Sequence, residues 1–170
     1  MMCKNHLMMQ KSSERGPAGS VAYLLSQVGA RSAQEFARLL APLDLAPADA
    51  GILRLLRQSP GISQQGLAQT LGMHASRLVA VIDALEKRGL VVREPNAKDR
   101  RLYSLRLTDA GMEILRSIGQ VARAHNELMC SGLEAEECAE LLRLLQRIAA
   151  RQEMLPGVHP GYKGESGEPR

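Results

Sequence analysis

Residues 71–91, which read LGMHASRLVAVIDALEKRGLV, decide the fold of this chain. The middle of this stretch predicts a helix over residues 75–88, which Gly89 ends, because its apolar residues recur at three- and four-residue steps: Leu78, Val81, Ile82 and Leu85. A shorter helix is predicted just before it, with Ser63 as its N-cap and Gly72 at its end. Two helices joined by a tight turn with a glycine are typical of a helix-turn-helix.

The hydrophobic period changes from 3.6 to 2 immediately after this pair of helices. Residues 90–93 (LVVR) and 102–107 (LYSLRL) predict two strands, and the composition of residues 95–99 (PNAKD) predicts the turn between them. Two short antiparallel strands around a charged tip form a wing. We therefore expect a winged helix-turn-helix core over residues 45–107.

Further helices are predicted on both sides of this core. Apolar periodicity and capping residues place them at residues 20–40, 47–58, 108–129 and 134–151. The expected fold is mainly α with a small two-stranded β-wing, in one folded domain over residues 20–154. Residues 1–19 and 155–170 lack periodicity and are rich in Gly, Pro and polar residues, so we expect a disordered N-terminal arm and tail.

Composition limits the possible function. The 170 residues are 45% hydrophobic and only 2% aromatic, which is typical of a helical globular protein, and no apolar run is long enough for a membrane span. Three cysteines without a CxxC spacing favour a cytoplasmic protein over a disulfide scaffold. The histidines are scattered, and no catalytic or cofactor motif is present, so we expect neither a metal nor a cofactor, and not an enzyme.

The charge pattern suggests a polyanion as partner. The net charge is +4, and residues 76–107 contain eight Lys and Arg side chains against four Asp and Glu. In a helix-turn-helix the second helix enters the major groove of DNA, and its first residues approach the base edges. These residues are His74, Ser76 and Arg77, of which Arg77 suits a bidentate contact to guanine. At the start of the preceding helix, Gln64 and Gln65 are candidates for phosphate contacts.

The expected tip of the wing supplies a second group of candidate DNA-binding residues. Long cationic side chains at such a tip can enter the negative minor groove. They are Lys98, Arg100 and Arg101. Asp99 would repel phosphate, so we interpret it as an acceptor that holds Arg101 in a bidentate pair.

Three segments in register resemble the MarR (multiple antibiotic resistance regulator) family. They are Leu-Glu-Lys-Arg-Gly-Leu-Val at residues 85–91, Asp-x-Arg at 99–101 and Leu-Thr-x-x-Gly at 107–111. The resemblance implies a homodimeric transcriptional regulator, most often a repressor, on a pseudopalindromic DNA operator. It implies that residues 20–42, 108–130 and 134–151 form the dimer layer, and that Arg101 enters the minor groove. The chain departs from the family at Val79 and Ala80, where many relatives have a Thr-Arg pair that touches DNA.

The apolar stripe of residues 108–130 also suggests dimerisation without the family, because it exceeds what one small wing domain needs to cover. Its members are Ile114, Leu115, Ile118, Val121, Ala122 and Leu128. Similar proteins often bind a small aromatic effector between the wing domain and the dimer layer. Candidates to line such a pocket are Tyr23, Phe36, Ile52 and Met112, although core packing explains each of them as well.

Two alternatives remain at this point. A winged helix can instead dock a protein without sequence-specific DNA binding, and an apolar outward face of the second helix would favour that function. Ala75, Val79 and Ala80 favour this alternative slightly, whereas the basic wing argues against it.

The second alternative is a thiol sensor. Thiol-sensing relatives use a cysteine in the first helix, where this chain has none. Cys138 lies on an apolar stripe and is interpreted as a small buried hydrophobic residue.

Overall fold

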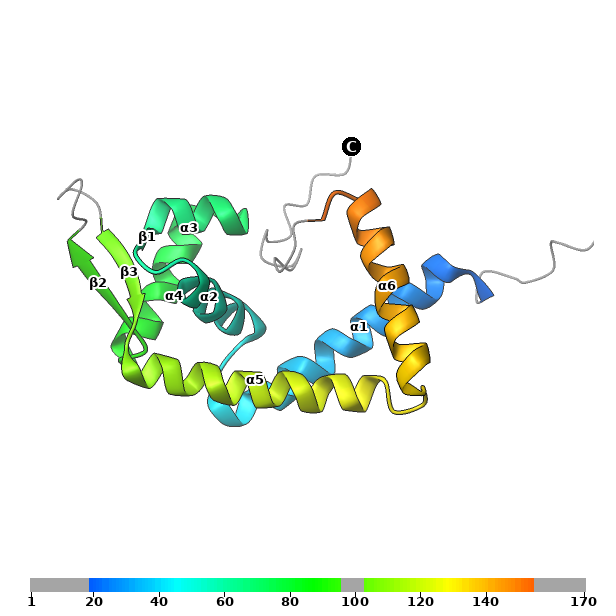
Figure 1. The fold of residues 1–170 in the computed structure, drawn as a ribbon. Helices are drawn as coiled ribbons and strands as arrows, with labels where there is room; N and C mark the ends of the chain where they lie inside the picture. The colour runs from blue at the N-terminus through cyan, green and yellow to red at the C-terminus, as the bar shows by residue number, and fades with distance from the viewer. Residues whose placement is uncertain (1–18, 96–102, 155–170) are drawn as a thin grey trace, which may run out of the picture. The chain divides into compact units, whose positions relative to one another are not determined.

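The computed structural model describes residues 19–95 and 103–154. The chain divides into two compact units, Met1–Glu35 and Phe36–Arg170, so that the first helix begins in one unit and ends in the other. The elements follow in the order α1 (Val21–Leu40), η2 (Ala41–Leu43), α2 (Pro47–Gln58), β1 (Ile62–Ser63), α3 (Gln64–Leu71), α4 (Ala75–Lys87), β2 (Val91–Pro95), β3 (Tyr103–Leu107), α5 (Asp109–Met129) and α6 (Ala135–Arg151) (Figure 1). The mainly helical fold with a wing is confirmed, and the helix bounds agree with the predictions within about two residues.

The helix-turn-helix forms for the local reasons that the sequence indicated. The hydroxyl of Ser63 accepts a hydrogen bond from the N–H of Gly66 (3.0 Å) and so caps α3. Gly72 follows α3 with a φ of 62°, and Gly89 follows α4 with a φ of 70°, in the left-handed region that glycine adopts without strain. The chain therefore turns sharply after each helix.

The wing contains one strand more than the two that the sequence predicted. Its sheet has the order β1-β3-β2, and the additional strand β1 pairs antiparallel with β3 through Ile62↔Leu105 and Ser63↔Ser104. Two residues are too few to show an alternating pattern, which is why this strand was missed. The other difference is Pro95, which was placed in the turn but continues β2 opposite Tyr103. A proline fits there because β2 is an edge strand.

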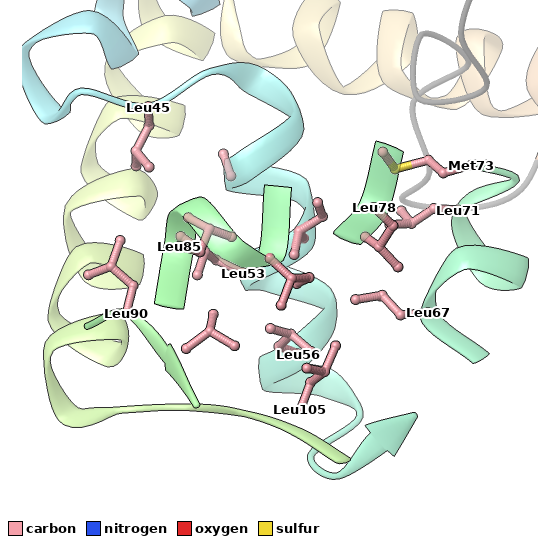
Figure 2. Packing of buried hydrophobic residues seen from close by; sticks show 14 of the residues in the cluster. Leu45, Leu53, Leu56, Leu67, Leu71, Met73, Leu78, Leu85, Leu90 and Leu105 are labelled. Atoms are coloured by element: carbon pink, nitrogen blue, oxygen red, sulfur yellow. The ribbon is translucent and has the colours of Figure 1, made fainter. Parts of the chain in front are cut away.

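The hydrophobic core lies under this helix-turn-helix. Leu53 and Leu56 of α2, Leu67 and Leu71 of α3 and Leu85 of α4 are at most 1% exposed. Figure 2 shows these leucines pointing into one cluster, together with residues of the sheet. Because the apolar face of α4 is fixed in this core, the opposite face of the helix points outward.

The apolar stripe of α5 is divided between two surroundings. Ile118 is buried, and Ile114, Leu115 and Val121 pack against the core of the same chain. Ala122 and Leu128 are exposed. The first half of α5 thus closes the winged-helix core, and only its second half leaves apolar surface uncovered.

The terminal helices expose many large apolar side chains. In α1, within the first unit, these are Val21, Tyr23, Leu24, Leu25 and Val28, and in α6 they are Leu141, Leu142, Leu144, Leu145 and Ile148. Within the described ranges, no helix has the length and hydropathy needed to cross a membrane. Residues 1–18 of the expected arm and the whole expected tail, 155–170, lie outside the described residues.

Candidate nucleic-acid interface

The N-terminal end of α4 presents the polar residues that the sequence singled out. His74 is the N-cap residue, with extended backbone and no side-chain cap bond, so the first N–H groups of α4 point outward without a side-chain acceptor. His74, Ser76 and Arg77 are all exposed. Leu78 and Ile82 on the opposite face are 0% exposed. The helix is therefore anchored on one side and offers a donor-rich, positive end on the other.

Arg77 differs from the other arginines near α4. Among the residues that the structure describes it forms no ion pair, whereas Arg93 and Arg106 are both paired with carboxylates. A guanidinium without an internal partner keeps its donors available for a base edge or a phosphate. Arg77 is thus the strongest candidate in α4 for direct DNA contact.

The two glutamines at the start of α3 lie in different surroundings. Gln65 is exposed, as a phosphate-contacting residue should be. Gln64 is partly buried, and its amide oxygen accepts a hydrogen bond from Nε of Arg93 (3.3 Å). This bond orients the side chain of Gln64 and leaves its amide NH₂ group as the donor for a ligand.

Arg93 connects the wing to α4, the second helix of the helix-turn-helix. The sequence reasoning missed this role. Its guanidinium forms ion pairs with Asp83 (2.5 Å) and with Glu86, both on α4, and its backbone N–H donates to Glu86 (3.2 Å). Burial lowers the pKa of Arg93, but the hydrogen bonds and charges of the two carboxylates outweigh it and raise the pKa above its ordinary value. Arg93 therefore stays charged and neutralises two acids that would repel DNA.

A signal for this network was present in the sequence. Asp83 and Glu86 lie three residues apart on a helix that faces a polyanion, so a nearby cation was required to balance them. Periodicity alone could not show which of the eight basic residues supplies it. In the folded chain Arg93 lies opposite Leu105 in the sheet, and its ion pairs show that its side chain reaches α4.

Two further contacts position α4 and the wing, and neither was foreseen. Arg88 donates to the backbone carbonyls of Asp44 (2.5 Å) and Leu43 (3.0 Å), which fixes the C-terminal end of α4 to the segment before α2. Thr108 donates from its hydroxyl to the carbonyl of Gly89 (2.6 Å) and accepts from the N–H of Gly111 (3.0 Å). These contacts fix the C-terminal end of α4 and the start of α5.

The remaining candidate DNA-binding residues belong to the expected tip of the wing. Lys98, Asp99, Arg100 and Arg101 lie outside the described residues, so the predicted Asp99–Arg101 pair stays a prediction. On the described part of the wing, Arg106 pairs with Glu94 (2.8 Å) across the two strands.

The four candidate effector-binding residues are in different environments. Ile52 is 1% exposed and belongs to the core, Phe36 and Met112 are partly buried, and Tyr23, in the first unit, is 43% exposed. None of them lines the hollow on α6 around Ile148 or the hollow between the ends of α5 and α6. Phe36 contacts the ring of His125 instead, with centroids 5.3 Å apart.

Comparison with known proteins agrees with this architecture. The model of the MarR family matches residues 43–102. An HTH-type transcriptional repressor of Mycobacterium tuberculosis is 30% identical over 130 residues, which cover 76% of this chain and 94% of the relative. Among solved structures, the transcriptional repressor CouR bound to a 23-mer DNA duplex is 33% identical, with a TM-score of 0.70 and coverage of 82% of this chain and 99% of that one.

Wild-type MarR from E. coli in its apo form is similar as well, with a TM-score of 0.70 and 26% identity over 76% of this chain and 96% of that chain. The matched region includes the helix-turn-helix, whose exposed α4 and paired Arg93 are described above. The chain belongs to the MarR family of winged-helix transcriptional regulators.

Proposed function

We propose that this protein is a homodimeric transcriptional repressor that binds a pseudopalindromic DNA operator through α4 and the wing. One observation carries the proposal: Arg77 is exposed and unpaired within the described residues at the N-terminal end of a helix whose other face is buried. A helix fixed in this way presents Arg77 in a defined direction, as base recognition requires. The DNA-bound structure of the similar repressor CouR supports the same partner.

The chemistry of α4 concentrates base recognition in few side chains. Arg77 can donate two hydrogen bonds to O6 and N7 of guanine, while His74 and Ser76 can contact bases or phosphate. Val79 and Ala80 are exposed but have no side-chain donor. We therefore expect Arg77 to dominate discrimination between operators, with the wing residues around Arg101 supplying affinity from the minor groove.

The exposed apolar faces of α1 and α6 support the homodimer. Leu142 is 58% exposed and Ile148 is 40% exposed, and α6 has no buried residue at all. A helix with such a face is stable in water when a second surface covers it, and a second copy of this chain supplies an identical one. Two copies would present two α4 helices, and reading heads about 34–36 Å apart match one turn of B-DNA, so we expect the operator to be a pseudopalindrome.

We also propose that a small aromatic ligand releases the protein from its operator. The tilted, partly buried ring pair of Phe36 and His125 supports it, because such a pair can open to stack on a third ring. A ligand that prefers the DNA-incompetent arrangement by about 1.4 kcal/mol would weaken operator binding tenfold. Titrating the protein–operator complex with substituted benzoic acids, with cyclohexanecarboxylic acid as the non-aromatic control, tests this part.

The decisive experiment measures DNA binding by fluorescence anisotropy at fixed salt, with an inverted repeat from upstream of the protein's own gene and a scrambled duplex. Arg77→Ala should weaken operator binding by about 1–3 kcal/mol and change scrambled-DNA binding little. Arg116→Ala is the matched control, since it removes the same charge from a side chain that is 70% exposed on α5. Equal losses on both duplexes would reduce Arg77 to a phosphate contact, and no binding at low salt would refute the proposed function.

A further inference from the structure

The turn between α5 and α6 brings together two of the three cysteines of the chain. Cys130 ends α5, and its N–H donates to the carbonyl of Asn126 (3.0 Å). Cys138 lies in the first turn of α6, where its N–H donates to the carbonyl of Glu134 (2.9 Å). The backbone thus holds both residues at defined positions, although seven residues separate them in the sequence.

The two cysteines share one hollow. Both line a hollow of about 250 Å³ between the ends of the two helices. Both cysteines are free and only partly buried. Sequence reasoning interpreted Cys138 as a buried hydrophobic residue, but the structure leaves it only partly buried and places it in the same hollow as Cys130.

We propose that Cys130 and Cys138 are a redox-active pair that a peroxide converts into a reversible disulfide within one chain. The backbone hydrogen bonds hold both residues in place on the two sides of the turn, and both cysteines line the same hollow. Nothing in the DNA-binding proposal depends on this step.

The order of the two reactions follows from the surroundings of Cys138. Partial burial, the hydrogen bond to Cys130 and the charges of Glu137 and Glu134 raise the pKa of Cys138. A raised pKa makes Cys138 the poorer first nucleophile, so the proposal assigns it the second step and assigns the first attack on peroxide to Cys130.

Atoms and electrons balance with peroxide as the oxidant. The Cys130 sulfur attacks one peroxide oxygen, the O–O bond breaks, and a sulfenic acid and one water result. The Cys138 sulfur then attacks the Cys130 sulfur, the S–O bond breaks, and the Cys138 proton leaves with the hydroxyl as a second water. Two thiols are oxidised and one peroxide is reduced. The disulfide closes a loop around residues 131–137 and ties the start of α6 to the end of α5.

The test uses the full chain with Cys3→Ser, so that Cys130 and Cys138 are the thiols that remain. After hydrogen peroxide, the thiols titratable in denatured protein should fall from both to none and return with dithiothreitol. Residues 124–143 contain no internal Lys or Arg, so one tryptic peptide carries both cysteines and should become lighter by two hydrogens. A glutamyl endopeptidase, which cuts between them, should release two fragments that stay joined until reduction.

Cys130→Ser and Cys138→Ser in the same background are the matched controls. Each should lose the joined fragments, and Cys138→Ser should accumulate the sulfenic or sulfinic acid of Cys130. Amide hydrogen exchange in the loop should slow several-fold in the oxidised protein relative to the reduced protein. A disulfide between two chains on a non-reducing gel, or a sulfinic acid on Cys130 beside a free Cys138 in the unsubstituted pair, would overturn the proposal.

Discussion

Gly111 provides the sharpest test of how the winged-helix core is built. A Cβ atom at this position would lie 2.1 Å from the carbonyl oxygen of Leu90 and 3.4 Å from Cδ2 of Leu107. The Leu90 carbonyl also accepts the backbone N–H of Thr108 (3.2 Å), the residue that caps α5. An alanine would therefore force the Leu90 carbonyl to shift and would break its hydrogen bond with Thr108 at the start of α5.

The expected magnitude follows from three contributions. Overpacking against backbone costs about 1–3 kcal/mol, and the lost hydrogen bond costs about 1 kcal/mol. The gain in helix propensity from Gly to Ala, at most about 1 kcal/mol, offsets part of this. We expect Gly111→Ala to lower the free energy of unfolding by about 2–3 kcal/mol.

Gly119→Ala is the matched control, because it makes the same chemical change in the same helix. The nearest atom to its Cβ would be Nη1 of Arg123 at 3.9 Å, so only the propensity gain remains and stability should rise by up to about 1 kcal/mol. Urea unfolding followed by circular dichroism, at equal protein concentration for all three proteins, gives the comparison. Equal stability of the two variants would refute the reasoning from the close approach to Leu90.

Three further predictions concern the interface and the dimer. Arg93→Ala should cost about 1–2 kcal/mol in urea unfolding, because it removes two ion pairs and the packing of an 18%-exposed side chain, while water solvates the exposed carboxylates that remain. A loss below about 0.5 kcal/mol, typical of ordinary surface changes, would show a dispensable surface pair. Arg101→Ala should lower the slope of log K against log salt by about one unit per protomer, measured by anisotropy titrations; an unchanged slope would remove the wing from the contact. Leu142→Asp should convert the dimer into monomers in analytical ultracentrifugation with the helical circular dichroism retained, and a persistent dimer would move the interface away from α6.

The parts of the fold that repeat a regular period were predictable from sequence. The buried face of α4 and the caps Ser63 and Thr108 lie where spacing and residue type placed them, since these depend on neighbours three or four positions away. Strand β1 was not predictable, because two residues have no period. Its pairing with β3 depends on a residue more than forty positions further along the chain.

The candidate site was predictable to a similar extent. Exposure of His74, Ser76 and Arg77 follows directly from the apolar face of the same helix. The partners of Arg93 and Arg88 could not be derived in this way, because both contacts join segments that meet only in the folded chain. The same holds for Cys130 and Cys138, which are eight positions apart in the sequence and line one hollow only because a turn reverses the chain between them.

The short strand β1 has a mechanical consequence. Ser63 pairs with Ser104 of the hairpin and at the same time caps α3, and the next residue, Gln64, is bonded to Arg93 on β2. Arg93 also pairs with Asp83 and Glu86, so the described strands of the hairpin are tied to both α3 and α4. We therefore expect these elements to move together, and we expect a small molecule that weakens DNA binding to act by changing the angle between the two winged-helix cores of a dimer.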